Sequence, residues 1–432
     1  MNERRGIVLA AVMVVAAASL WTTVALLARA GVETAGIDGG SESIQAESAM
    51  RSAVLVYASE LYEQRERLRV GVAAELDEQV VLWESGTRAM VARLIPVEGE
   101  QRVVAEASRL DINYATADQL DHVIGFSESI LRARGRHRFE DSREILSLLD
   151  RSAVEATSDG GLCERLTVHA HEPNVQQNGN LRINLAVPWS EELGDRIRTR
   201  FDENTAEALH GVLKDNPVQT DADLMRLILA FKLDPSAWPG ALDAFSMEPV
   251  HYRLGRIDIN TASAEVMASL PGVTSSQASA MAERRSSLDS ELLATPAWPF
   301  IEGLLPVEIA VDFLDRTTTG SWTWRVRIAC GELPNDELDA PFTSVQIAEV
   351  VLDVAGERPR IAAMRDITMR TQTVAWPEYL DESQEEDVAD EVIDPSDDEV
   401  RIEGEESDPP MPTEPDTPVA VDEDGRLGRW RP

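Results

Sequence analysis

The sequence has few of the side chains that bind soft metals or build disulfide frameworks. Its 432 residues include two cysteines and six histidines. A zinc cluster or a disulfide-rich scaffold needs more of these residues, so both classes are excluded. Basic side chains are also scarce, because 40 Lys and Arg stand against 77 Asp and Glu and give a net charge of −37. Charge repulsion therefore disfavours generic binding to nucleic acid.

Sequence signatures of catalysis are missing as well. The chain contains no His-Glu-x-x-His, no Gly-x-Ser-x-Gly, no phosphate-binding glycine-rich loop and no Cys-x-x-Cys. Such motifs bring nucleophiles, metal ligands or phosphate-binding amides together at fixed spacing. We therefore expect a protein that is not an enzyme and has no catalytic cofactor.

One long apolar run is present, at the N-terminus. Residues 7–28 carry no charged side chain and follow Arg4 and Arg5. As a helix these 22 residues would span about 33 Å, enough to cross a bilayer core of roughly 30 Å. The two preceding arginines predict a cytoplasmic N-terminus. We therefore expect a single-pass membrane protein whose chain beyond Arg29 is exported.

Three ways of processing this segment are open. A secretory signal could be cut after Ala28-Arg29-Ala30, although the apolar core is longer than such signals usually have. The segment could instead remain as an uncleaved anchor. Cleavage on the cytoplasmic side is the third route, since Arg-Arg-Gly6 stands directly before Ile7.

The pattern beyond the apolar run predicts an α+β fold in which helices interrupt an antiparallel sheet. Residues 43–68 have the apolar spacing of an amphipathic helix, and residues 110–314 are mainly helical in pattern. Alternating apolar and polar residues predict strands on both sides of that helical region. The predicted strand regions are 80–107, with a hairpin turn at 96–100, then 321–329, 344–354 and 360–369.

The C-terminal segment has a different composition. Residues 378–424 contain 21 acidic side chains against one basic side chain, Arg401, and several prolines. Such a segment cannot bury enough apolar surface to offset the entropy lost on ordering. We expect residues 377–432 to be a disordered acidic tail without a specific partner.

An internal repeat lies inside the helical region. The sequence Asp111-Ile-Asn-Tyr-Ala-Thr-Ala-Asp-Gln-Leu recurs 147 positions later as Asp258-Ile-Asn-Thr-Ala-Ser-Ala-Glu-Val-Met. Each copy predicts a helix, a tight turn and a second helix. These helix-hairpin-helix units are expected near residues 111–149 and 258–305. The expected caps of the first helices are Thr116 and Ser263, those of the second helices are Ser127 and Ser275, and the turn glycines are Gly125 and Gly272.

Helix-hairpin-helix units often bind DNA phosphates through turn amides at a helix N-terminus. The usual turn is Gly-x-Gly followed by basic residues, whereas both turns here lack the second glycine and Glu128 follows the first turn. We therefore expect the two units to be packing modules. A membrane-tethered DNA-binding protein of the uptake type is the alternative function, and a membrane-anchored scaffold is a third.

Three weaker site hypotheses remain. His169 and His171 would share one face of a strand, but no third metal ligand is evident, so packing histidines are the favoured interpretation. Cys163 and Cys330 both flank predicted strands in an oxidising compartment, which makes a disulfide between them a candidate. An acidic loop offers oxygen atoms that calcium could use, and it comprises Asn335, Asp336, Glu337 and Asp339.

Taken together, these features resemble the type II secretion system protein K family, the large minor pseudopilins. The matching residues are Arg-Arg-Gly6 before the apolar segment, the motifs at 111–116 and 258–263, and the junction 166–174 followed by Arg182-Ile-Asn-Leu. The resemblance extends from about Arg5 to about Trp376.

The resemblance implies a pilin-like antiparallel sheet with a large all-α domain inserted into it, behind a transmembrane helix. The expected divisions are a leader at 1–6, a transmembrane helix at 7–28, a pilin-like helix and first strands at 29–109, an inserted α-domain at 110–315, C-terminal strands at 316–376 and the tail at 377–432.

The resemblance also implies a role in protein secretion. A prepilin peptidase would cleave after Gly6 and leave Ile7 as a terminus that can be methylated, in an inner-membrane protein whose bulk is periplasmic. Most pilin-like subunits have Glu at the fifth mature position; Ala11 stands there in this chain, as the resemblance to the K family implies. A subunit without that glutamate cannot neutralise the charged N-terminus of another subunit. This is expected of the subunit at the tip of a pseudopilus. The implied partners are other minor pseudopilins and the inner-membrane secretion platform, and structural calcium is implied in the pilin-like part.

Overall fold

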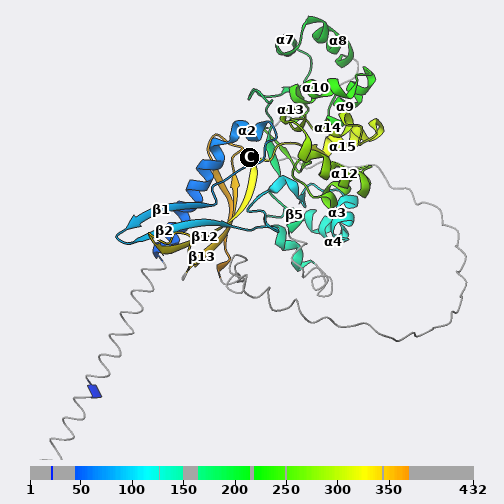
Figure 1. The fold of residues 1–432 in the computed structure, drawn as a ribbon. Helices are drawn as coiled ribbons and strands as arrows, with labels where there is room; N and C mark the ends of the chain where they lie inside the picture. Colours follow the sequence, from blue (N-terminus) through cyan, green and yellow to red (C-terminus); the bar gives the residue numbers. More distant parts are fainter. Residues whose placement is uncertain are drawn as a thin grey trace, which may run out of the picture. The chain divides into compact units, whose positions relative to one another are not determined.

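The structure is a computed structural model that describes residues 21–22, 44–125, 127–148, 164–214, 218–248, 251–342 and 345–368. These residues belong to one compact unit, Met1–Thr373. The described chain is a mixed α+β fold built around a six-stranded antiparallel sheet, which confirms the expected fold class at this level (Figure 1).

The strand order of the sheet joins residues from both ends of the described chain. The order is β1-β2-β12-β13-β14, and β3 also pairs with β12. All of these pairings are antiparallel. The strands are β1 (Gln79–Ser85), β2 (Arg88–Ile95), β3 (Val103–Ala105), β12 (Thr323–Pro334), β13 (Val345–Asp353) and β14 (Arg360–Asp366).

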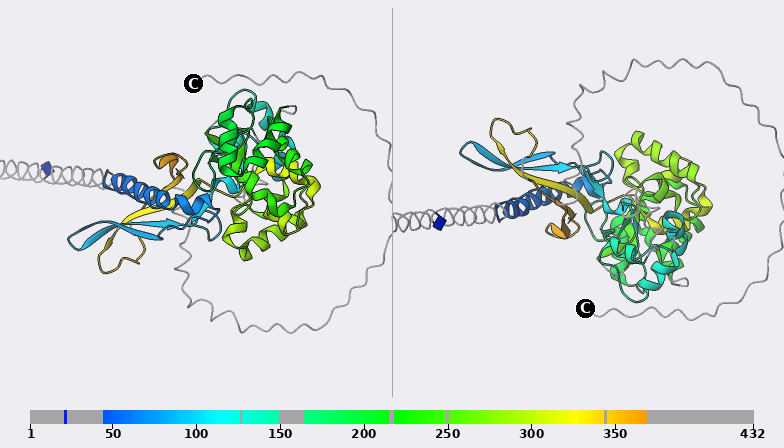
Figure 2. Two further views of the ribbon diagram at one scale, coloured as in Figure 1. Left: turned by 90° about the horizontal axis from the view of Figure 1, so that it is seen from above. Right: turned by 90° about the horizontal axis from the view of Figure 1, so that it is seen from below.

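A long helix covers one face of this sheet. Residues 44–63 are helical and are followed by the short helix α2 (Arg65–Arg69). Met50, Val54, Tyr57 and Leu61 recur at helical spacing and are fully buried. They share one core with the inward-facing residues of β12, such as Trp324. Figure 2 shows this helix alongside the sheet in both views.

The turn predicted at residues 96–100 is present, since the backbone N–H of Val97 donates to the carbonyl of Gln101 at 2.7 Å. The expected hairpin is wrong, because the strands on either side of this turn do not pair with each other. The strands β1 and β2 pair with each other, and the turn between them is at Gly86, which has a φ of 63°. Strand β3 pairs with the distant strand β12 instead of β2. A local pattern predicts strands and turns but not which strands pair, and glycines at positive φ occur both in the β1–β2 turn, at Gly86, and in the predicted segment, at Gly99.

The chain between β3 and β12 forms the helical insertion, and its described residues make three helical units. Each unit begins and ends with a two-residue strand, and the two strands pair in parallel. The first unit runs from β4 (Leu110–Asp111) to β5 (Leu166–Thr167), the second from β7 (Ile183–Asn184) to β8 (Phe245–Ser246), and the third from β10 (Ile257–Asp258) to β11 (Thr317–Thr318).

The sequence repeat accounts for the first and third units, while the second unit was missed by the sequence analysis. Among its described residues, the first unit contains α3 (Ala117–Ile124) and α4 (Ser127–Arg134). The second unit contains α7 (Glu191–Arg200), α8 (Glu203–Leu213), α9 (Asp221–Ala230) and α10 (Trp238–Ala244). The third contains α11 (Ala264–Ala268), α12 (Ser275–Arg284), α13 (Ser290–Leu293), α14 (Trp298–Ile301) and α15 (Ala310–Arg316).

The three helical units share one hydrophobic core. Its contributors include Leu120 from the first unit, Ile197 from the second, and Met267 and Trp298 from the third, all buried. Between the units, β6 (His171–Pro173) pairs antiparallel with β9 (Tyr252–Leu254). The insertion is therefore one packed domain.

Several expectations lie outside the described residues. They concern the leader at 1–6, most of the apolar segment at 7–28, Cys163 and the acidic tail at 377–432. Among the helices that the structure does describe, none has the length and apolar character needed to cross a membrane.

Candidate functional site

The repeated Asp-Ile-Asn motif forms the same local structure twice. Asp111 accepts hydrogen bonds from the backbone N–H of Asn113 at 2.9 Å and of Ala170 at 3.2 Å. Asp258 accepts from the backbone N–H of Asn260 at 3.0 Å and from the hydroxyl of Ser321 at 2.7 Å. Both carboxyl groups are buried. In both copies the aspartate therefore hydrogen-bonds a residue of the segment that follows the unit, Ala170 or Ser321.

Burial changes the acidity of these two aspartates. Desolvation raises the pKa of Asp111 to about 7, although the hydrogen bonds from Asn113 and Ala170 act in the opposite direction. Burial also raises the pKa of Asp258 above its usual range, against the bond from Ser321. A carboxyl group in a low-dielectric site favours the neutral form unless a cation faces it closely.

An arginine completes each repeat. Arg134 Nη1 donates to the carbonyl of Ala115 at 2.7 Å, and Arg285 Nη1 donates to the carbonyl of Ala262 at 2.6 Å. Each arginine comes from the second helix of its hairpin or the turn directly after it and reaches back to the loop before the first helix. This repeated contact was not predicted from the sequence.

The caps and turn glycines largely follow the prediction. Thr116 caps α3 in a reciprocal capping box with Gln119, and Ser263 caps α11. Gly125 and Gly272 adopt φ values of 72° and 75°, where a side chain would be strained. The expected cap Ser275 is wrong, because Thr274 one residue earlier caps α12.

The expected cap Ser127 is itself the first residue of α4. Ser127 donates its backbone N–H to the carboxylate of Asp121 at 3.0 Å. In the third unit, the backbone N–H of Thr274 donates to the side chain of Gln277 at 3.0 Å. Side chains of the chain itself therefore occupy these two turn amides, and in the first unit the occupant is negatively charged.

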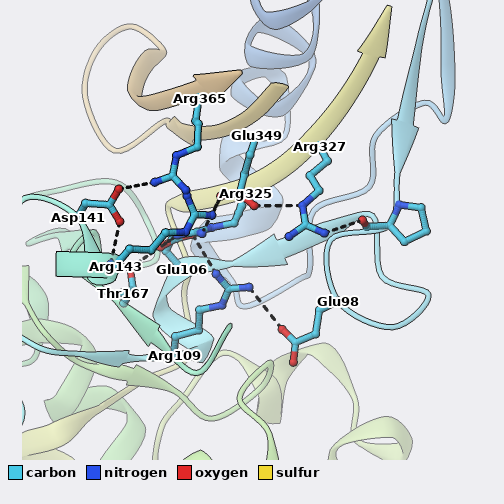
Figure 3. Close-up of polar contacts among 11 residues, drawn as sticks. Glu98, Glu106, Arg109, Asp141, Arg143, Thr167, Arg325, Arg327, Glu349 and Arg365 are labelled. Atoms are coloured by element: carbon cyan, nitrogen blue, oxygen red, sulfur yellow. Dashed lines mark hydrogen bonds and ion pairs between the residues drawn. The ribbon is translucent and has the colours of Figure 1, made fainter. Parts of the chain in front are cut away.

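A cluster of charged side chains joins the sheet to the first unit, and we call it the junction cluster (Figure 3). At its centre, Arg325 of β12 forms a bidentate pair with Glu106, with Nε–Oε1 at 2.6 Å and Nη2–Oε2 at 3.2 Å. Thr167 of β5 donates to the same carboxylate. The cluster comprises Glu98, Glu106, Arg109, Asp141, Arg143, Arg325, Arg327, Glu349 and Arg365.

Strand alternation explains why charged side chains gather here. Trp324 and Val326 of β12 point into the core under the long helix, so Arg325 between them points to the opposite face of the sheet. On β13, Glu349 lies on that same opposite face and accepts from Arg325 at 3.2 Å and from Arg143 at 2.7 Å. The outer face of the sheet is thus tied to the first helical unit by ion pairs.

The charges of the junction cluster stabilise one another. Burial by itself would raise the pKa of Glu106, which is fully buried, but the positive charges of Arg325 and Arg109 lower the pKa to about 2. The same contacts hold the pKa of Arg325 above its usual range despite its burial. The carboxylate and its arginines therefore stay ionised at neutral pH, and the cluster fastens the two regions together.

The weaker site hypotheses are placed as follows. His171 Nε2 lies 3.3 Å from a carboxylate oxygen of Asp353, and its ring meets Tyr252 edge to face. Asn335 in the acidic loop donates its side-chain N–H to the carbonyl of Gly86 at 3.1 Å and so supports the β1–β2 turn. No group of three or more His, Cys, Asp or Glu that could hold a metal occurs within the described ranges. Calcium binding stays a prediction without an assigned site.

Cys330 is a buried free thiol on β12, and its Sγ lies 4.0 Å from Met50 Sδ of the long helix. Burial raises the pKa of this thiol to about 12. Its expected partner Cys163 lies outside the described residues, so the disulfide stays a prediction. The thiol contributes to the packing of helix against sheet.

In a comparison with known proteins, no protein-family model matches the chain, and no curated protein matches it. The function is therefore argued from the residues and contacts described above.

Proposed function

We propose that the chain is a minor pseudopilin that initiates or caps the pseudopilus tip of a type II secretion system. The observation that carries this proposal is the placement of the helical insertion. Gly71, just after α2, is so close to the third unit that an added Cβ would lie 2.5 Å from the carbonyl oxygen of Leu293. The insertion thus meets the C-terminal end of the long helix, whereas Ile44 is 70% exposed at its other end.

This arrangement suits the last subunit of a filament. If residues 7–28 continue the long helix into the inner membrane, the insertion lies on the side away from the membrane. A packed domain at that end obstructs the stacking of another subunit above it. Ala11 in place of a glutamate adds to this, because the chain then offers no acidic partner to another subunit's charged N-terminus.

The junction cluster supports the same role. A tip domain transmits force between the filament below it and whatever it contacts, so it needs a firm attachment to the sheet. The buried Glu106–Arg325 pair and the Arg143–Glu349 pair provide such an attachment. The proposed partners are other minor pseudopilins and the inner-membrane secretion platform, reached through the long helix and the sheet.

The mature N-terminus tests this proposal. Intact mass and terminal peptide mapping are carried out on protein from membranes, with and without a prepilin peptidase. We expect a terminus at Ile7 that depends on the peptidase. A Gly6→Leu variant should remain uncut, whereas the matched variant Ala30→Leu, which removes the candidate secretory cleavage site, should be cut as usual. An intact Met1, or a terminus near Gly31, contradicts the proposal.

The DNA-binding alternative has its own test. The carboxylate of Asp121 at the first hairpin turn would repel a phosphate, and this supports a packing role for the hairpins. We expect no retention of the full-length protein on immobilised DNA at low salt. Retention that falls steeply with added salt would favour the alternative instead.

A further inference from the structure

A small cavity lies between the end of the long helix and the helical insertion. Its volume is about 60 Å³. Three arginines from different parts of the chain line it: Arg69 of α2, Arg182 directly before β7, and Arg253 of β9. Three cations around one enclosed space are costly to keep together unless negative charge balances them.

The guanidinium groups around this cavity are incompletely hydrogen-bonded. Arg182 has two buried nitrogens, Nε and Nη1, without an acceptor, and Arg69 and Arg253 each have a buried Nε without one. No ion pair joins Arg182 to a carboxylate within the part of the chain that the structure describes. Buried donors without acceptors are rare in folded proteins, so these four N–H groups indicate a missing partner.

The two carboxylates that line the cavity are already engaged. Glu172 Oε1 forms an ion pair with Arg253 Nη1 at 2.9 Å without the geometry of a hydrogen bond, and Glu172 Oε2 accepts from the hydroxyl of Thr318. Asp243 accepts from the backbone N–H of Gln177 at 2.7 Å and from Arg200 at 3.2 Å. The lining side chains therefore carry three positive and two negative charges, and the positive charge of Arg182 is the one left over.

Arg182 keeps its charge in this environment. Burial, together with the nearby charge of Arg253, lowers its pKa to about 10, so the guanidinium is still protonated at neutral pH. A charged and unpaired guanidinium offers planar, charge-assisted N–H donors that suit the oxygens of an anion.

We propose that this cavity binds a small oxyanion, held by Arg182 and Arg253 of the insertion and by Arg69 at the end of the long helix. The volume equals that of about four water-sized groups, which matches a phosphate or sulfate ion or a single carboxylate. A bound anion bridges the long helix and the insertion, so it fixes the orientation of the insertion.

Thermal unfolding of the full-length protein in detergent tests this site. Inorganic phosphate is titrated against sodium chloride at constant ionic strength, with sulfate and acetate as parallel arms. The variants are Arg182→Met, which removes the unpaired charge, and Arg132→Met as a matched control. Arg132 is an exposed arginine that pairs with Glu128 away from the cavity.

We expect phosphate to raise the unfolding temperature of the wild type and of Arg132→Met by about 5 °C at roughly 100 times its Kd. Arg182→Met should need at least about a tenfold higher phosphate concentration for the same rise, which corresponds to a tenfold weaker Kd. Without phosphate, Arg182→Met should unfold at the wild-type temperature or above, because it loses an unpaired buried charge.

The arms also identify the anion. A rise with phosphate and sulfate alone identifies a tetrahedral oxyanion, whereas an equal rise with acetate identifies a carboxylate as the ligand. The proposal is overturned if the wild type shows no saturable rise with any of the three anions. An equal rise in Arg182→Met and the wild type would overturn it as well, since the anion would then act elsewhere.

Discussion

The first and third helical units share a motif, a turn glycine and an arginine contact, yet they attach to the sheet region differently. The first unit is joined through charged pairs, such as Arg143 with Glu349 and Asp141 with Arg365. The third unit is joined through hydrogen bonds of Ser and Asn side chains: Ser321 donates to Asp258, and Asn260 donates to the carbonyl of Thr319 at 3.3 Å. Two copies of one motif can therefore keep their internal structure while their attachments diverge.

The turns of the two units differ in a similar way. An alanine Cβ at position 125 would meet no heavy atom within 4 Å, whereas one at position 272 would lie 2.6 Å from Ile309 Cγ2. Both glycines are exposed, but the side chain of Ile309 packs against the turn of the third unit. The difference shows that a glycine can be required by φ alone at one position and by both φ and space at the equivalent position.

The largest expected effect comes from breaking the charged attachment of the first unit. Glu106→Gln removes the fully buried negative charge between Arg325 and Arg109 and leaves them their contacts to Glu349 and Glu98, so we expect it to lower the free energy of unfolding by about 3–5 kcal/mol. Chemical denaturation of the full-length protein in detergent measures this. Glu128→Gln is the matched control, because that carboxylate pairs with Arg132 on the surface, and it should change stability by less than about 0.5 kcal/mol. Equal effects of the two variants would show that the junction cluster adds no stability.

The next largest effect separates the two turns. Gly272→Ala should lower the free energy of unfolding by about 3 kcal/mol, since it combines an unfavourable φ with a steric clash. Gly125→Ala should lose about 1 kcal/mol, from φ alone. Adding Ile309→Ala to Gly272→Ala should recover part of the loss. If both glycine variants lower the free energy of unfolding by the same amount, the contact of Ile309 with the turn does not affect stability.

A third prediction concerns the dependence of stability on pH. The folded-state pKa of Asp111 is about 7, above the unfolded value of 3.8, so its stabilising contribution is full at low pH and is lost as the pH rises toward 7. Wild type should lose stability relative to Asp111→Asn by at most about 1.4 kcal/mol per pH unit between about pH 4 and 7.

Unfolding of both proteins at several pH values measures this difference, and Asp258→Asn should show the same sign. A difference between wild type and Asp111→Asn that stays constant over this range would contradict the raised pKa. The charged attachment behaves in the opposite sense. The lowered pKa of Glu106 gives stability that is present at neutral pH and is lost only as the pH falls toward 2.

The smallest effects are expected at the helix caps, where the two units are most alike. Thr116→Ala and Ser263→Ala should each cost about 1 kcal/mol, because each removes an acceptor for a helix N-terminal amide. The loss should be slightly larger for Thr116, which takes part in a reciprocal capping box with Gln119. Thermal unfolding of the two variants side by side measures this, and a loss at only one cap would show that the units are not locally equivalent.

The sequence predicted the local features of both units. Caps depend on a side chain within three residues of the amide it binds, and turn glycines on a single φ, so Thr116, Ser263, Gly125 and Gly272 could be assigned from short stretches of sequence. The strands around the insertion were found because alternation is also a local pattern. The cap at Ser275 was off by one residue because Thr274 and Ser275 are equally suited to the role in sequence.

Partners distant in the sequence could not be predicted in this way. The sequence by itself determined an α+β chain with a helical insertion, two hairpins and their caps, since those depend on neighbouring residues. Only the tertiary structure decided that β3 pairs with β12, that Glu106 meets Arg325, and that Arg182 remains unpaired beside two other arginines. The physical reason is that strand pairing and charge pairing depend on which distant segments the common core brings together, and composition and periodicity carry no record of that choice.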